Sequence, residues 1–243
     1  MRKQIRIGAG IASLMAALSA HADLSIGDQR GNARAVMEAA GVLQGMPYTI
    51  DWHEFPNAAP VLEALNSNHL DAGMIGDASL TFAAAAGVRA KAIFASNYYG
   101  NAVITAQTSG ISSAQGLRGK RIGTVKGSTG HALALAALQG AGLTAQDVTF
   151  VFTTPAEATL ALSNGAVDAV ASWEPYVSFA TQQSQARILV DGKSFPALNY
   201  LAATPEALTN KREELRDFTQ RLSQARQWGP RTRIPMPRSY PSC

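Results

Sequence analysis

The sequence predicts an α/β protein with two similar lobes. Short apolar runs alternate with alanine-rich segments of helical length, which is the pattern of a mainly parallel sheet flanked by helices. The pattern also repeats, because residues 65–72 (LNSNHLDA) match residues 162–169 (LSNGAVDA) at an offset of 97 positions. The same offset places Phe55 on Phe152. We therefore expect two equivalent units that face each other across a cleft.

The first element is an export signal. Three basic residues within the first six positions precede an apolar stretch over 7–18, and small residues follow at 20 and 22. This order is typical of a secretory signal peptide, and the stretch is shorter than the roughly 20 residues that span a bilayer. We expect residues 1–22 to be removed and the mature protein to be periplasmic, with a retained membrane anchor as the alternative.

Two groups of strands and helices follow. The strands are expected at 24–27, 48–52, 72–75 and 92–96 in the first unit, and at 121–125, 149–152, 169–172 and 188–190 in the second. The helices are expected to begin at Asn32, Pro60, Ser79, Thr129, Ala156 and Pro175. Two more strands, 101–106 and 199–204, would carry the chain between the lobes and act as a hinge. The first lobe would then comprise 23–100 and 196–227, and the second lobe 101–195.

The last segment, residues 228–243, breaks the pattern. It contains four prolines and has no hydrophobic periodicity, so an irregular tail is expected. A truncated or out-of-frame end and a natural disordered tail are both compatible with this composition.

Composition argues against several classes of protein. The formal net charge of +4 arises at the two ends, since basic residues lie at positions 2, 3, 6, 231, 233 and 238. The body has no surplus of basic residues, so a nucleic-acid partner is not expected. Cys243 is the sole cysteine and the four histidines are scattered, so we expect no internal disulfide, metal site or cofactor.

The loops that follow the strands predict an anion site between the lobes. In open α/β sheets, ligands lie beyond the carboxyl ends of the strands. There, residues 29–32 (QRGN) correspond to residues 126–129 (KGST), and each loop leads into a helix whose free N–H groups favour an anion. Ser128 and Thr129 could instead be plain N-caps that touch no ligand, and both interpretations stay open. Neither loop carries a nucleotide-binding motif.

Two more pairs of loops would close the cleft. These pairs are 56–59 with 154–155, and 76–78 with 173–175. Trp173 could cover an apolar tail of the ligand or pack in the core of its lobe. Asp77 and Glu174 follow corresponding strands, where they could accept hydrogen bonds from a ligand amine or only cap helices.

Several segments resemble the substrate-binding proteins of ABC importers for aliphatic sulfonates, taurine and nitrate. The segments are 26–31 (IGDQRG), 52–65 (WHEFPNAAPVLEAL), 166–169 (AVDA) and 173–175 (WEP). The resemblance covers about 24–226, and segment 52–65 is closest to the sulfonate branch. The turn at 57–60 (NAAP) differs from the more glycine-containing turn that is usual in that branch.

The resemblance implies a type II periplasmic-binding-protein fold that closes on one small organic anion, most of all an aliphatic sulfonate. It also implies delivery of that anion to an ABC permease in the inner membrane, and we expect a monomer. By the same resemblance, the ligand-binding residues would be Gln29, Asn57, Ala58, Gly76, Asp77, Ser128, Thr129 and Trp173. Glu174 joins this set because of its place after a strand.

Two other functions are compatible with the same scaffold. An enzyme, such as a sulfinate desulfinase or a pyrimidine-precursor synthase, would need a nucleophile and a base in the cleft. The sequence contains no recognisable set of this kind, so no enzyme activity is expected. A ligand sensor would bind in the same way but would pass its closed shape to a receptor. Transport and sensing stay open at this point, as do taurine, longer alkanesulfonates and nitrate as ligands.

Overall fold

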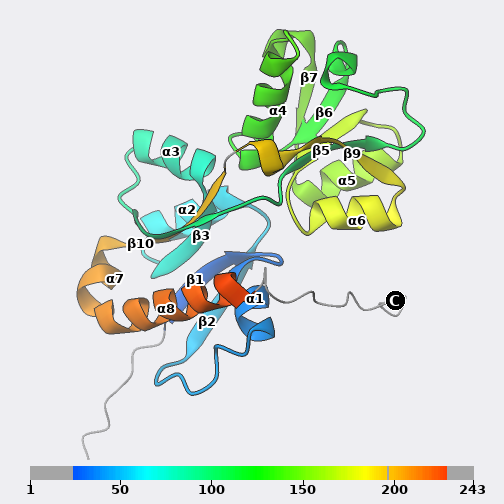
Figure 1. The fold of residues 1–243 in the computed structure, drawn as a ribbon. Helices are drawn as coiled ribbons and strands as arrows, with labels where there is room; N and C mark the ends of the chain where they lie inside the picture. Colours follow the sequence, from blue (N-terminus) through cyan, green and yellow to red (C-terminus); the bar gives the residue numbers. More distant parts are fainter. Residues whose placement is uncertain (1–23, 196, 229–243) are drawn as a thin grey trace, which may run out of the picture.

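The computed structural model describes residues 24–195 and 197–228, which form two α/β lobes (Figure 1). Each lobe is built around its own five-stranded sheet. The expected signal peptide and the expected tail after Trp228 lie outside the described residues. Among the helices that are described, none is both long and apolar enough to cross a membrane.

The first lobe contains a sheet with the strand order β2-β1-β3-β10-β4. Its strands are β1 (Leu24–Gln29), β2 (Ile50–Phe55), β3 (Ala72–Gly76), β4 (Lys91–Asn97) and β10 (Leu198–Ala203). β1 pairs in parallel with β2 and β3, whereas β10 runs antiparallel between β3 and β4. The strand expected from residue 48 begins two residues later, because Tyr48 is buried and contacts the last helix instead.

Helices cover both faces of this sheet. They are α1 (Ala33–Ala39), α2 (Ala58–Asn66), α3 (Asp77–Ala85), α7 (Pro205–Asn210) and α8 (Arg212–Trp228). One face packs against α1 and α8 around Ile26, Met37 and Phe218. The other face packs against α2 around Val61 and Ile75. Burial on both faces explains why the central strand β3 contains only Ala, Gly, Met and Ile.

The second lobe repeats this arrangement with the order β7-β6-β8-β5-β9. Its strands are β5 (Ala102–Ala106), β6 (Arg121–Thr124), β7 (Thr149–Phe152), β8 (Ala169–Ser172) and β9 (Ala186–Asp191). Its α-helices are α4 (Thr129–Gly140), α5 (Pro155–Ser163) and α6 (Tyr176–Gln183). β5 runs antiparallel between β8 and β9, as β10 does in the first sheet.

The offset between the lobes is 97 positions for some elements and 96 for others. α2 and α5 match at 97. In the sheets, Ile26 pairs with Ala72, and Ile122 pairs with Ala169. Ala72 and Ala169 correspond at 97, but their partners Ile26 and Ile122 are only 96 positions apart. The loops after those strands keep this offset, because Gly31 and Gly127 both have a positive φ. The correspondence expected at 97 is therefore one residue out in these two loops.

The expected hinge strands lie within the sheets. β5 pairs only with strands of the second sheet and β10 only with strands of the first, so neither strand spans the two lobes. The crossings occur in the short segments just before each of them. This arrangement follows from backbone pairing, since a strand that is bonded on both sides belongs to one rigid sheet.

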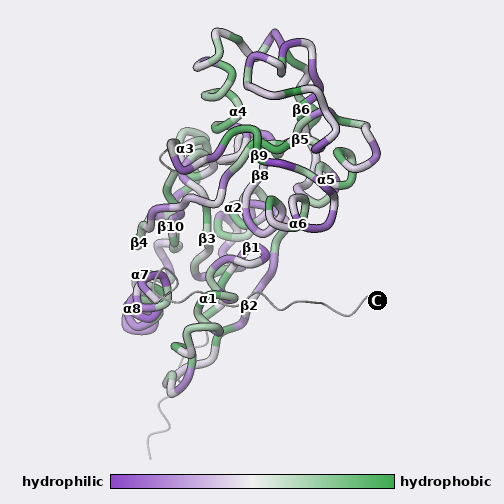
Figure 2. The backbone as a smooth tube through the Cα atoms, turned by 45° about the vertical axis from the view of Figure 1, so that its right-hand side comes forward, coloured by the Kyte–Doolittle hydropathy of each residue, from purple (hydrophilic) through white to green (hydrophobic). Residues whose placement is uncertain are grey.

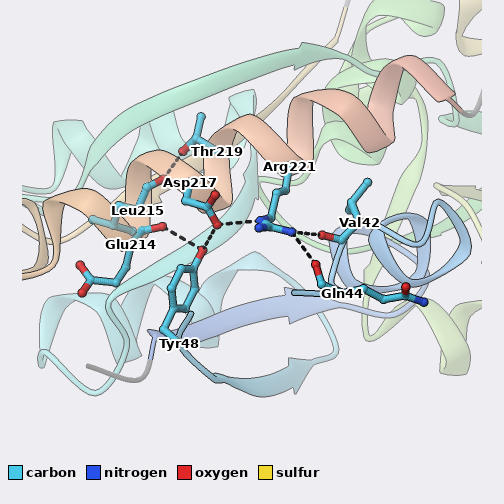
Figure 3. Close-up of polar contacts among 8 residues, drawn as sticks. All are labelled: Val42, Gln44, Tyr48, Glu214, Leu215, Asp217, Thr219 and Arg221. Carbon is cyan, nitrogen blue, oxygen red and sulfur yellow. Dashed lines mark hydrogen bonds and ion pairs between the residues drawn. The ribbon is translucent and has the colours of Figure 1, made fainter. Parts of the chain in front are cut away.

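Helix α8 is attached to the first lobe by polar contacts as well as by its apolar stripe. Figure 2 shows α8 mostly in the hydrophilic colour, and its buried side is formed by Leu215, Phe218, Leu222 and Ala225. The Tyr48 hydroxyl lies 2.9 Å from the Asp217 carboxylate (Figure 3). Arg221 donates to Asp217 at 2.7 Å and to the carbonyl oxygen of Val42 at 2.6 Å. These contacts fix the helix over the segment before β2.

Candidate functional site

A cavity of about 720 Å³ lies between the two lobes. Its volume is in the range of pockets that bind small organic molecules. Its walls include eight of the nine residues expected at the site: Gln29, Asn57, Ala58, Gly76, Ser128, Thr129, Trp173 and Glu174. The loops after the strands of both sheets thus meet at one cavity.

Asp77 is the exception among the expected residues, because it is not part of the cavity wall. Its carboxylate accepts the N–H of Ala78 at 2.7 Å and the N–H of Leu198 at 2.9 Å. Asp77 therefore joins the start of α3 to the start of β10. This role positions the strand beside the crossing rather than a ligand.

Trp173 and Glu174 line the cavity from the second lobe. Trp173 is only 8% exposed, yet it belongs to none of the four hydrophobic clusters found among the described residues. Its ring makes an edge contact with Tyr176 at 6.3 Å between centroids. Glu174 accepts the N–H of Ser178 at 3.1 Å, so it caps α6 as well as facing the cavity.

The start of α4 offers backbone donors to the cavity. Ser128 is the N-cap, and its hydroxyl oxygen accepts the N–H of His131 at 3.1 Å. The Thr129 hydroxyl donates to the side chain of Asn101 at 3.1 Å. Across residues 24–195 and 197–228, the N–H groups of Thr129 and Gly130 have no hydrogen-bond acceptor. Both interpretations of Ser128 thus fit the structure, since it caps the helix and also lines the cavity.

The start of α1 is different from the start of α4. The buried carboxylate of Asp28 accepts the N–H of Ala33 at 3.2 Å and the N–H of Arg34 at 2.8 Å. Burial raises the pKa of Asp28 to about 6, and hydrogen bonds from the backbone oppose this shift. The first N–H groups of α1 are therefore occupied by the protein itself. The free helix N–H groups that were expected just after loop 29–32 are therefore not available at Ala33 and Arg34.

Arg226 was not expected from the sequence and is the main cation of the site. It extends from α8 to the cavity wall, and its Nη2 donates to the Asn32 side chain, which also accepts from Asn199 at 3.0 Å. Its Nε is buried without a hydrogen-bond partner among the described residues. Burial lowers the pKa of Arg226, while Asp28 opposes the shift. The signal in the sequence is its position: it follows Leu222 by four residues, on the buried side of an amphipathic helix.

The charges around the cavity favour an anion. Arg30, Lys126 and Arg226 line it together with a single carboxylate, that of Glu174. In the part of the chain that the structure describes, no group of His, Cys, Asp and Glu residues is placed to hold a metal ion. An anion could thus be bound by a guanidinium from one lobe and by backbone N–H groups from the other.

Comparison with known proteins gives the family. The family described as NMT1/THI5 like matches residues 50–229. The chain belongs to the NMT1/THI5-like family. The match runs from β2 to the end of α8, so it covers most of both lobes.

Two relatives of this NMT1/THI5-like chain are named as aliphatic sulfonates-binding proteins. The protein from Escherichia coli (strain K12) is 36% identical over 222 residues, which are 86% of this chain and 70% of that protein. The protein from Bacillus subtilis (strain 168) is 36% identical over 79% of this chain, and the chain spans only 54% of its length.

A solved structure confirms the fold. The alkanesulfonate-binding protein SsuA from Xanthomonas axonopodis pv. citri, bound to MOPS, has a TM-score of 0.75 and 30% identity. The likeness covers 84% of this chain and 72% of that protein. The predicted two-lobed α/β fold of the periplasmic binding proteins is therefore confirmed.

Proposed function

We propose that this protein is the extracytoplasmic solute-binding component of an ABC importer, and that it closes on an aliphatic sulfonate. The observation that carries the proposal is the buried Nε of Arg226, which has no partner among the described residues, at a cavity that also faces the open N–H groups of α4. The names of the relatives support the choice of a sulfonate, as does the bound MOPS of the solved structure, because MOPS carries a sulfonate group.

The proposed binding mode divides the ligand between the lobes. The sulfonate head group lies between Arg226 of the first lobe and the start of α4 in the second, where Thr129 offers its N–H group and Ser128 its hydroxyl to the cavity. Its three oxygens share one charge, so several donors are needed to replace their hydration. Gln29, Asn57, Ala58, Gly76 and Glu174 form the remaining walls, and Trp173 covers the tail of the ligand.

The partners follow from this function. The closed protein, a monomer in the periplasm, delivers the anion to a permease in the inner membrane and does no chemistry on it. No sulfonate-cleaving set of nucleophile and base lines the cavity: its candidate base, His131, accepts the N–H of Gly127, and no cysteine lies in the described residues.

The proposal is tested by thermal unfolding with a panel of methanesulfonate, butanesulfonate, taurine, nitrate and sulfate. A ligand that binds only the folded state raises the melting temperature, and we expect the sulfonates to do so most. Arg226→Ala should weaken sulfonate binding about 100-fold, because truncating one partner of a buried charged pair costs roughly 2–5 kcal/mol.

The matched control is Arg216→Ala, which removes an exposed arginine from the same helix. It should leave the affinity unchanged. Equal affinities for Arg226→Ala and Arg216→Ala would remove Arg226 from the site. Turnover of a sulfonate or sulfinate by the purified protein would favour an enzyme instead.

A further inference from the structure

Beside the cavity, α3 of the first lobe is joined to the loop before α4 of the second lobe by a hydroxyl–carbonyl hydrogen bond. The Ser79 hydroxyl in the first lobe donates to the Gly127 carbonyl oxygen in the second lobe at 3.2 Å. The Phe82 ring lies one turn further along α3 and approaches the same glycine, since a Cβ built on Gly127 would be 3.5 Å from the ring. The Gly127 carbonyl is thus the point at which the first lobe binds this loop.

Gly127 is itself held in place by a histidine. Its N–H donates to the Nδ1 of His131 at 3.2 Å, and its φ of +74° is a conformation that favours glycine. The His131 ring is fixed in turn by edge contacts with Phe150 and Phe152, at 4.9 and 5.3 Å between centroids. We call Ser79, Gly127 and His131 the Gly127 clasp.

The hydrogen bond from Gly127 defines the state of the imidazole. An Nδ1 that accepts an N–H carries no proton, so His131 is neutral in this structure and its proton is on Nε2. When Nδ1 gains a proton it becomes a donor and repels the Gly127 N–H. The loop would then lose the contact that presents the carbonyl of Gly127 to Ser79.

We infer that His131 is a positioning residue for closure: it holds the Gly127 carbonyl where Ser79 can bind it, and its protonation releases the closed form. This inference rests on the proposed function, because it assigns a regulation to the same cleft. It treats His131, which also lines the cavity, as a residue that acts through the loop.

The surroundings of His131 set the direction of the pH effect. Lys126, in the same loop, is the charged group whose field acts on the His131 ring. On the side of β7 the ring contacts phenylalanines, which carry no charge. From α3, the uncharged Ser79 and Phe82 contact the loop. Burial, followed by the charge of Lys126, lowers the pKa of His131 below its ordinary value of 6.5. The clasp is therefore complete at neutral pH, and its contribution to closure is lost as the pH falls through this lowered pKa.

Binding measurements on the full chain test the inference. Ser79→Ala and His131→Ala should each raise the Kd for butanesulfonate about fivefold at pH 7.5, which corresponds to one net hydrogen bond. The double variant should lose no more than either single variant, since both remove the same contact. His131→Asn, which keeps a short acceptor near the place of Nδ1, should restore most of the affinity. Thr81→Ala is the control on the solvent side of α3.

The pH profile separates positioning from plain packing. Wild-type affinity should decline as the pH falls through the lowered pKa of His131, because the imidazole is neutral only above that pKa, whereas His131→Asn should lack this decline. Additive losses in the double variant, or the same decline in His131→Asn, would overturn the inference.

A measurement without ligand keeps this test independent of the proposed function. In the NMR spectrum of the ligand-free protein, the Gly127 amide and the His131 ring should titrate together, and the Gly127 amide of His131→Asn should not titrate. If no anion of the panel binds, the sulfonate proposal fails while this titration still decides the clasp. If the chemical shift of the Gly127 amide does not change as His131 titrates, the proposed role of His131 is wrong, even if sulfonates bind.

Discussion

The two lobes share one backbone plan but treat the start of their equivalent helices in opposite ways. In the first lobe, Asp28 occupies the leading N–H groups of α1. In the second lobe, the equivalent position is Thr124, whose hydroxyl donates to the carbonyl oxygen of Ala171 at 2.8 Å, and the leading N–H groups of α4 stay open. The two lobes therefore share a backbone fold, but of these two helices only α4 begins with N–H groups that are free to bind a ligand.

This difference shows how the proposed site combines its charges. The first lobe places a carboxylate at the start of α1, and its positive charges at the cavity are the side chains of Arg30 and, from α8, Arg226. The second lobe supplies neutral backbone donors and no buried cation. An anion between them would bind to two unlike surfaces, which ties ligand binding to closure of the cleft.

After the loss expected for Arg226→Ala, the largest effect is expected where Gly76 of the first lobe faces Thr129 of the second. A Cβ on Gly76 would lie 2.7 Å from the Thr129 Cγ2 of the other lobe, while the φ of Gly76, −70°, suits any residue. Gly76→Ala should therefore hinder closure and not folding. We expect the Kd for butanesulfonate to rise about tenfold or more, since overpacking costs roughly 1–3 kcal/mol.

A second substitution tests this steric reason. Thr129→Ser removes the Cγ2 that the new methyl group would meet, so Gly76→Ala with Thr129→Ser should recover most of the affinity. Gly110→Ala is the control, because a Cβ there has no heavy atom within 4 Å. Calorimetric titration of these three variants and the wild type is sufficient, and a Gly76→Ala protein with wild-type affinity would show that closure does not bring Gly76 this close to Thr129.

A smaller effect is expected at the start of α4. Ser128→Ala removes the N-cap and, in the proposed binding mode, one donor to the ligand. It should lower stability by about 1 kcal/mol and raise the Kd about fivefold. Thr129→Ala removes the bond to Asn101 and should add to the loss of affinity without unfolding the protein.

Another N-cap separates these two roles of Ser128. Thr154→Ala removes the N-cap of α5, which starts outside the cavity wall, so it should lower stability without a change in affinity. Urea unfolding and calorimetric titration measure the two quantities. Identical results for Ser128→Ala and Thr154→Ala would mean that Ser128 is only a helix cap.

Part of the fold was accessible from the sequence because several of its strands are short apolar runs. The strands expected at 149–152 and 169–172 coincide with β7 and β8, whose apolar runs are bounded by polar turns. The repeat added the pairing of the two units, since α2 and α5 follow the same offset. Local pattern and spacing are sufficient for such features.

The differences between the two sides of the site could not be predicted from local sequence patterns. The place of Arg226 depends on α8, which is fixed to the first lobe through Tyr48 and Arg221 (Figure 3). These contacts join residues separated by 169 and 179 positions, so no local pattern reports them. The sequence likewise places Asp28 at the end of a strand, but it does not show that its carboxylate turns back onto α1.

The smallest effect on stability and anion affinity is expected from the titration of Asp28. Only the first lobe has a titrating group at this position, so the effect is specific to that lobe. Burial raises the pKa of Asp28 from an ordinary value of 3.8 to about 6, so the folded state holds this proton more tightly than the unfolded state does. The contribution of Asp28 to stability is therefore greatest below the ordinary value and is lost as the pH rises through the raised pKa. Thr124, its equivalent in the second lobe, does not titrate.

The same titration should alter anion affinity through Arg226. Below about pH 6 a neutral Asp28 no longer offsets the guanidinium charge, so the affinity for butanesulfonate should rise about twofold. This change is opposite in sign to the loss expected from His131, and His131→Asn isolates it. Asp28→Asn, combined with His131→Asn, should bind with an affinity that is flat from pH 5 to 8, as measured by calorimetric titration. A profile that keeps its slope in this double variant would place the titrating group elsewhere and would remove Asp28 from the charge balance between the lobes.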